Sequence, residues 1–253
     1  ERPYCRAPSS GSRAHMRQRV AIDGITLLAS MNNCIVIDCS GQVLSVAIAV
    51  KGNPSNVWHE TIHEQHGQAE MLAPLANRVF AATPLKQWAE LDCILVCRGP
   101  GGFTGLRVSI AFALGLAASI PGVIIRSIST DAYWRYRITN DPCLLADNIY
   151  CAVDTRRGDC YLRSVSESGS AWMIARDLNG QIGSSDSLVV GNSGLIAALR
   201  DQRTIMEEID TAALAVAVLD PQFDTTVLTN ILQPLYVRPP TISRAKDTKF
   251  GPS

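Results

Sequence analysis

Hydrophobic and polar positions divide the chain into short apolar runs, typical of strands, and longer stripes with helical spacing. After Gly67 the spacing becomes helical, and Pro74 should kink that helix or cost it a hydrogen bond. The elements predicted for the first half are a strand-turn-strand over 34–53, a strand at 56–63, a helix from Gly67, a buried strand at 92–97, a helix over about 105–119 and a strand at 122–128.

The second half repeats this plan more loosely. Its predicted elements are a helix at 131–138, a hairpin over 148–166 that turns at 155–158, a strand entering a small-residue loop at 187–194 and a helix at 211–219. A strand-hairpin opening and a glycine loop in each half indicate α/β layering with mixed sheets in two lobes. We expect a first lobe over 31–129 and a second over 130–240.

The two ends of the chain differ from this pattern. Residues 1–30 are basic, rich in Ser and Pro, and almost without apolar periodicity. We expect a disordered extension followed by an ordered fold from Met31, with a targeting segment or a cloning remnant as alternatives. Residues 241–253 are expected to be a flexible tail.

Composition narrows the function classes. Lys+Arg and Asp+Glu both total 23, so the chain lacks the cationic excess of a free-standing nucleic-acid binder. Most of the eight cysteines lie in apolar runs and none forms a Cys-x-x-Cys pair, which favours buried thiols in a reduced, cytoplasmic compartment. The uncharged run between Arg107 and Arg126 is broken by Pro121 and Gly122, so we predict a helix, a turn and a strand there and no membrane span.

A possible zinc motif occurs at His59-Glu60-x-x-His63. Such a motif needs a helix, which places both imidazoles on one side of the metal. Here the predicted structure is a strand, in which the two histidines lie about 13 Å apart. A polar edge strand with surface histidines is therefore favoured over a metal centre, and no metal site is expected.

The stretch Gly99 to Arg107, "GPGGFTGLR", follows a buried strand and opens onto a helix. Backbone N–H groups in such a loop can point at an anion. The spacing fits neither a Walker A loop nor Gly-x-Gly-x-x-Gly, because no Lys follows a glycine and Thr104 stands at the third glycine position. The residues alone leave two alternatives open, a phosphate-binding loop and a tight strand-to-helix turn.

Four motifs in register resemble the bacterial TsaB (YeaZ) family over about residues 33–245. In chain order they are "VIDCSGQVLSVAI" with Asp38 at the acidic position, the glycine loop, the hairpin "AVDTRRGDCY" and the closing "QPLYVRPP". His66 is then the family-like histidine, and His59 and His63 precede it in a strand. The chain departs from the family pattern at Gly102, where Ser is usual, and at Cys39, where Thr is usual.

This resemblance implies the two-lobed actin/Hsp70-like (ASKHA) fold and a part in threonylcarbamoyladenosine synthesis on tRNA. The catalytic relative, TsaD, binds a metal through a His-x-x-x-His pair, and Thr130 and Trp134 stand at the corresponding positions here. The resemblance therefore implies a non-catalytic subunit that binds a TsaD-type partner and, through it, a TsaE-type ATPase and tRNA. It implies no cofactor in the isolated chain, but a nucleotide at the partner interface, and it leaves a homodimer open.

Two sets of candidate residues follow from this resemblance, and no catalytic residue is assigned. The first set would face a phosphate: Asp38, Gly99, Gly101, Gly102, Thr104 and Gly105. The second lies on two helices rich in small residues, which family members pair with the partner's helices: Ala69, Leu72, Ala73, Ala76, Leu106, Ile110, Ala111, Ala113, Leu114 and Ala117.

Two other functions remain as alternatives. The first is a stand-alone ATPase or phosphotransferase of the same fold, which would use Asp38 and the glycine loop. The second is a zinc peptidase acting through His59 and His63. The basic residues near the C-terminal end could touch tRNA, although a solvated tail is the commoner explanation: Arg238, Arg244, Lys246 and Lys249.

Overall fold

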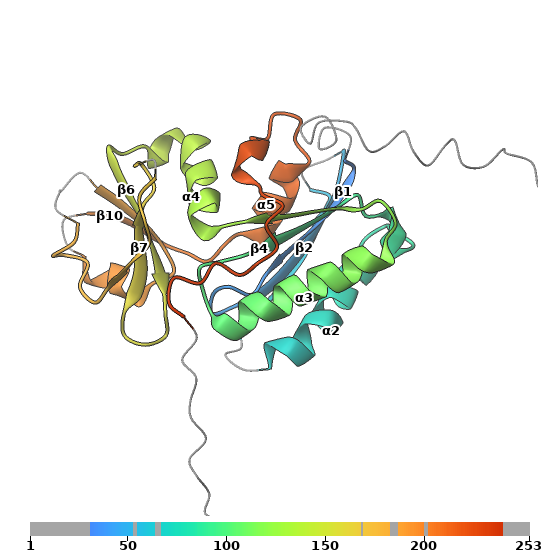
Figure 1. Ribbon diagram of the computed structural model, residues 1–253. Helices are drawn as coiled ribbons and strands as arrows, with labels where there is room; N and C mark the ends of the chain where they lie inside the picture. The colour runs from blue at the N-terminus through green and yellow to red at the C-terminus, as the bar shows by residue number, and fades with distance from the viewer. Residues whose placement is uncertain are drawn as a thin grey trace, which may run out of the picture.

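The computed structural model describes residues 31–52, 55–63, 67–167, 169–182, 187–199 and 202–239. The extension and the tail predicted at the two ends of the chain lie outside these residues, as does His66. Two five-stranded mixed sheets stand at opposite ends of the molecule, with helices packed around them (Figure 1). The predicted α/β class with mixed sheets is confirmed.

The first sheet has the strand order β3-β2-β1-β4-β5. Its strands are β1 (Asn33–Asp38), β2 (Leu44–Val50), β3 (Val57–Ile62), β4 (Cys93–Cys97) and β5 (Ile124–Ile128). β1 pairs antiparallel with β2, and β2 with β3, whereas β4 is parallel to both β1 and β5. All five strands lie where the hydrophobic pattern predicts them.

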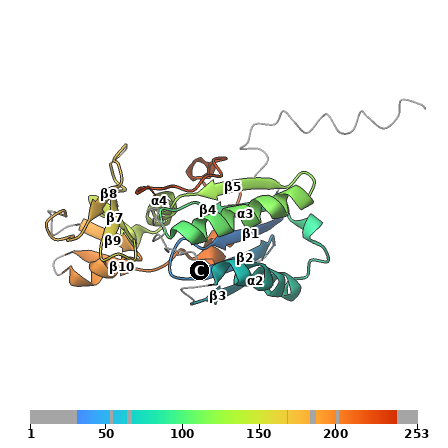
Figure 2. The ribbon, with the colours of Figure 1, turned by 60° about the horizontal axis from the view of Figure 1, so that its bottom comes forward.

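Helices cover both faces of this sheet, which explains why its central strands are apolar throughout. α2 (Gln68–Ala82) and α3 (Phe103–Ser119) lie side by side on one face, and α5 (Thr211–Val218) lies on the other (Figures 1 and 2). Ile35 and Ile37 belong to the core under α2 and α3, whereas Cys34 and Val36 belong to the core that includes α5. This alternation follows the two-residue period of a strand.

The second sheet has the order β10-β9-β6-β7-β8. Its strands are β6 (Asn148–Asp154), β7 (Cys160–Ser164), β8 (Met173–Ala175), β9 (Ser187–Gly191) and β10 (Arg203–Met206). The β6–β7 hairpin turns as predicted, with Arg156 at φ 60° and Gly158 at φ 77°. The sequence pattern did not reveal β8 and β10, which are three and four residues long and largely exposed.

α4 (Thr130–Thr139) links the two sheets. Its Tyr133 and Trp134 are almost fully buried, in one core cluster that joins β1, β4 and α5 to strands β6 and β9. The lobe boundary at residue 130 stays a prediction, and α5, from the second half of the chain, packs on the first sheet. Short 3-10 turns occur at Trp88–Glu90, Pro142–Leu144, Gly194–Ala198 and Thr225–Val227.

The uncharged run between Arg107 and Arg126 forms the end of α3, a turn and the start of β5, as expected. Across the described residues, no helix has the length and apolar character needed to cross a membrane.

Candidate functional site

The glycine loop packs directly on the turn between β1 and β2. Gly102 N–H donates to the carbonyl oxygen of Ser40 at 2.7 Å. A Cβ atom at Gly101 would lie 2.2 Å from that same oxygen, and one at Gly105 would lie 2.0 Å from the carbonyl oxygen of Cys39. These glycines therefore allow two backbone segments to touch, which supports the tight-turn alternative. The amide of Gly102 is already occupied by a backbone acceptor.

Asp38 lies at the end of β1, fully buried beneath this turn. Its Oδ1 accepts the Ser40 N–H at 2.8 Å, and its Oδ2 has no hydrogen-bond partner. Burial raises the pKa of Asp38 to about 6, and the nearby Glu208 carboxylate adds to this increase, whereas the Ser40 hydrogen bonds lower the pKa. Asp38 is thus the acidic group of the predicted phosphate-facing set, but it points into a closed interior.

The cavity beneath the turn after β1 is very small. It has a volume of about 10 Å³ and is lined by Ser40, Thr130, Trp134, Val153, Gly191, Asn192, Glu207, Glu208 and Ile209. That volume is about what one water molecule needs, whereas small-molecule sites take about 300 Å³ or more. A larger pocket, of about 150 Å³, lies between the glycine loop and the second half of the chain and is lined by Gly101, Gly102, Phe103, Thr155, Arg157, Tyr161, Leu235, Tyr236, Val237, Arg238 and Pro239.

Thr130 and Trp134 stand one helical turn apart on α4, and both line this cavity. These are the positions at which the resemblance expects the metal-binding histidines of the catalytic relative. Trp134 is 1% exposed and belongs to the core that joins the two sheets. Trp134 thus packs the core at a position where the resemblance implies a metal ligand in the catalytic relative.

The zinc-peptidase alternative lacks the helix that would place both histidines on one side of a metal ion. His59 lies within β3, opposite Ala47 of β2, and His63 follows the end of that strand. Glu60, the group that would activate water, forms an exposed ion pair with Arg78 at 2.6 Å. Within the part of the chain that the structure describes, no group of three His, Cys, Asp or Glu side chains could hold a metal ion.

The predicted interface set divides into two groups. Five of its residues are 5% exposed or less, because they lie on the inner sides of α2 and α3, which face the chain's own sheet: Leu72, Ala76, Leu106, Ile110 and Ala113. Placing them at a partner interface is therefore corrected. The remaining five lie on the outer side of the two helices, four of them exposed and Ala117 half-buried: Ala69, Ala73, Ala111, Leu114 and Ala117.

A second feature at the start of α3 was not foreseen from the sequence. The rings of Phe103 and Tyr236 stack with centroids 5.1 Å apart, and the Arg107 guanidinium lies 3.9 Å from the Phe103 centroid. Arg107 Nε also donates to the Tyr236 hydroxyl at 2.8 Å. This contact joins the motif "QPLYVRPP", which contains Tyr236, to the end of the glycine loop.

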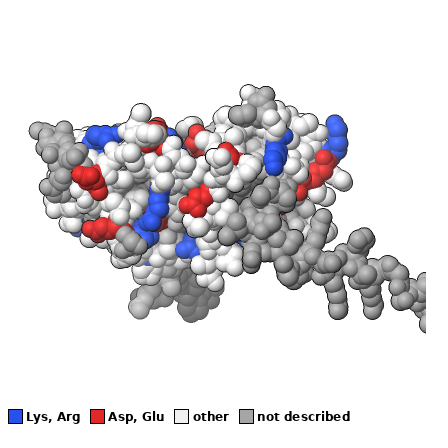
Figure 3. Space-filling view, turned by 90° about the horizontal axis from the view of Figure 1, so that it is seen from above, with Lys and Arg blue, Asp and Glu red and all other residues white. Residues whose placement is uncertain are grey.

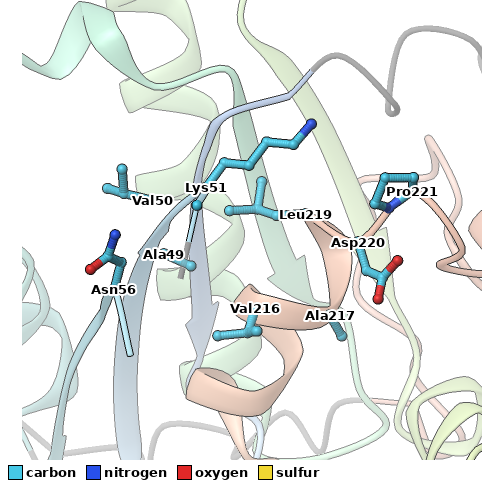
Figure 4. A pocket seen from close by; sticks show the side chains of 10 residues that line it. Ala49, Val50, Lys51, Asn56, Val216, Ala217, Leu219, Asp220 and Pro221 are labelled. Carbon is cyan, nitrogen blue, oxygen red and sulfur yellow. The ribbon is translucent and has the colours of Figure 1, made fainter. Parts of the chain in front are cut away.

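The charge pattern and the groove at the ends of β2 and α5 indicate no further site. The face seen in Figure 3 carries scattered Lys, Arg, Asp and Glu, without one large region of either sign. A groove of about 290 Å³ lies between the ends of β2 and α5, far from the glycine loop in the fold, and is mostly apolar (Figure 4). Its lining residues include Ala49, Val50, Val216, Ala217, Leu219 and Pro221.

Comparisons with known proteins agree with the resemblance drawn from the motifs. A family model described as TsaD, tRNA N6-adenosine threonylcarbamoyltransferase, matches residues 59–172. The chain is 27% identical over 146 residues to the tRNA threonylcarbamoyladenosine biosynthesis protein TsaB of Haemophilus influenzae, covering 57% of this chain and 55% of that protein. It is 28% identical over 129 residues to the TsaB of Escherichia coli, covering 50% and 52%. The chain thus spans about half the length of the curated relatives it matches.

Solved structures support the fold. YeaZ from Pseudomonas aeruginosa superimposes with a TM-score of 0.60 at 19% identity, covering 82% of this chain and 100% of that one. A protein described as similar to peptidase YEAZ, from the same organism, gives a TM-score of 0.57 at 18% identity with the same coverage. The two-lobed actin/Hsp70-like fold implied by the resemblance is confirmed, as is the resemblance to the TsaB (YeaZ) proteins.

The glycine-loop contact predicts opposite effects at two positions of one helix. Gly105→Ala should destabilise the protein by about 1–3 kcal/mol, because its Cβ would collide with the Cys39 carbonyl oxygen. Gly115→Ala, exposed on the same helix with nothing within 4 Å of the added atom, should stabilise by about 0.5–1 kcal/mol. Urea denaturation of both variants measures the difference, and equal effects would show that the loop does not constrain residue 105.

The buried carboxyl predicts a pH-dependent difference between the wild type and Asp38→Asn. Because the native pKa of Asp38 lies above its unfolded value, the native state holds the proton more tightly and loses stability as pH rises through about 6. At pH 8 Asp38→Asn should be more stable than the wild type by about 3 kcal/mol, since a rise of about two pKa units corresponds to roughly that energy. Below pH 4 the difference should vanish. Denaturation curves of both proteins measured across this pH range test the prediction. A stability difference that does not change with pH would show that the pKa of Asp38 is not raised in the native state.

Proposed function

We propose that this chain, which is related to the TsaB (YeaZ) family, acts in tRNA threonylcarbamoyladenosine biosynthesis as a non-catalytic subunit that binds and supports a TsaD-type catalytic partner. Two curated relatives carry that biosynthetic role in their names, and the TsaD family model matches part of the chain. The observation that carries the proposal is an exposed face of small residues on two adjacent helices, one of which, α3, has no charged residue from Val108 to Ser119.

The cleft supports a non-catalytic role. A stand-alone ATPase or phosphotransferase would need space for a triphosphate, whereas the cavity beneath the turn after β1 holds about 10 Å³ and the pocket at the glycine loop about 150 Å³, both below the roughly 300 Å³ of a small-molecule site. The positions that correspond to the partner's metal-binding histidines are Thr130 and Trp134. Asp38, the acid that such an enzyme would use, has one carboxylate oxygen engaged by Ser40 and the other buried without a partner.

The outer face of α2 and α3 supports the partner surface. From Val108 to Ser119, α3 carries no charged residue, although much of that stretch is exposed. A helix that is apolar on all sides is usually covered. Exposed small residues recur at helical spacing on both helices, with one larger apolar residue among them: Ala69, Ala73 and Ala81 on α2, and Ala111, Leu114, Gly115 and Ala118 on α3.

Small side chains on adjacent helices allow two helices of a partner to approach closely, as in a four-helix bundle. α2 and α3 already pack against each other, so the chain contributes half of such a bundle. A second copy of this chain could offer the same surface, and a homodimer is therefore the competing occupant. A nucleotide, a TsaE-type ATPase and tRNA belong to the proposal only through the partner, because the chain carries equal numbers of acidic and basic residues.

Two substitutions on this face test the proposal. Ala73→Arg and Ala111→Arg each place a long, charged side chain where close helix approach is required, and each should weaken binding to a TsaD-type protein at least tenfold. Ala171→Arg, at an exposed alanine of the second half, is the matched control and should bind like the wild type. Ala113 is unsuitable, because it is fully buried and an Arg there would damage the fold.

Binding is measured by titration calorimetry, with circular dichroism to show that each variant is folded. Wild-type affinity in both variants would contradict the proposed surface. Loss of self-association without loss of TsaD-type binding would assign the surface to a homodimer instead.

A further inference from the structure

A closed circuit of hydrogen bonds joins the turn after β1 to the second sheet. Gln42 N–H donates to Glu208 Oε1 at 3.0 Å, and Asn192 Nδ2 donates to Glu208 Oε2 at 2.8 Å. Asn192 Oδ1 in turn accepts the Asp154 N–H at 2.9 Å. Asp154 Oδ2 accepts Gln42 Nε2 at 3.1 Å, which returns the circuit to its start.

Arg156 adds a second connection between the same two regions. Its backbone N–H donates to Asp154 Oδ1 at 2.8 Å, and its guanidinium donates to the carbonyl oxygen of Gly41. Arg156 has a positive φ of 60°, a conformation that is uncommon for residues other than glycine. The hairpin turn thereby contacts the turn that follows β1 in the first sheet.

Glu208 lies against the backbone of this turn. A Cβ atom at Gly41 would be 1.9 Å from Glu208 Oε2, so the carboxylate covers the Cα of Gly41 directly. Both of its oxygens accept hydrogen bonds, one from each side of the cleft. A carboxylate that accepts a backbone N–H in a turn after a buried strand occupies the position in which such a turn holds an anion.

The surroundings of Glu208 disfavour a second anion. Asp38, Asp154 and Glu207 lie close to the same turn or line the same cavity, and the Arg156 guanidinium reaches the Gly41 carbonyl oxygen. A phosphate placed here would meet several carboxylates at short range, which is unfavourable. The cavity of about 10 Å³ beside Glu208 is too small for a phosphate, and the open groove of about 300 Å³ that Glu208 also lines has two acidic lining residues, Glu207 and Glu208, and no basic one.

We infer that Glu208 is an internal ligand of the turn 38–42, and that its carboxylate latches the two lobes together in the position that an external anion would otherwise take. The carboxylate thereby holds the turn 38–42 against the second sheet. The inference concerns the isolated protein and stands whether or not the proposed partner surface is correct.

Hydrogen exchange at the Gln42 amide tests the latch in the full chain. Glu208→Ala removes the acceptor, and the Gln42 amide should then exchange at least tenfold faster. Glu207→Ala is the matched control, because the neighbouring carboxylate pairs with Arg137 at the surface and, in the part of the chain that the structure describes, forms no hydrogen bond with the turn. In that variant the rate should stay within twofold of the wild type.

Gly41→Ala tests the same contact without removing a charge. Its methyl group would displace the Glu208 carboxylate, so this variant should accelerate exchange of the Gln42 amide as much as Glu208→Ala does. In the double variant the methyl group has nothing left to displace, and exchange should be no faster than in Glu208→Ala alone. An unchanged Gln42 rate in Glu208→Ala, or additive effects of the two substitutions, would overturn the latch.

Discussion

The structure depends on one backbone contact, between the glycine loop and the turn that follows β1. The Cys39 and Ser40 carbonyl oxygens lie so close to Gly105 and Gly101 that no side chain fits between them. This contact fixes where α3 begins relative to β1, and α2 packs beside α3. The position of the surface proposed for a partner therefore depends on this single close approach.

The same contact also occupies a backbone N–H group that could otherwise bind phosphate. A strand, a glycine-rich segment and a helix start provide N–H groups that can bind an anion. Here the Gly102 N–H donates to Ser40, and the neighbouring Gln42 N–H donates to Glu208. In this chain, internal acceptors therefore occupy one amide of the glycine loop and one of the adjacent turn.

Much of the fold could be predicted from the sequence, because its signals are local. Apolar runs gave β1, β4 and β9, and the switch from two-residue to helical spacing after Gly67 separated β3 from α2. β8 and β10 were missed since short, exposed strands leave no apolar pattern. The start of α3 was placed two residues late, which is the usual uncertainty at a helix end.

The candidate site was harder to predict, because it depends on contacts between distant residues. Small residues on α2 and α3 indicated closely packed helices, but not which side faces the sheet, so Leu72 and Ala113 were assigned to the wrong surface. Glu208 carries no motif. Its role comes from meeting Gln42, which lies 166 residues earlier in the chain. Only the three-dimensional arrangement could reveal that pair.

A closed cleft and a small-residue surface are also energetically consistent with each other. A surface of Ala and Gly loses almost no side-chain entropy when a partner covers it, but it offers few atoms for contact. Such a surface binds well only if its two helices are already held in the correct relative position. The glycine-loop contact supplies that rigidity in the first lobe, and the hydrogen-bond circuit around Glu208 ties the first lobe to the second. The contacts that hold the two helices and the two sheets in place therefore provide the rigidity that the proposed partner surface requires.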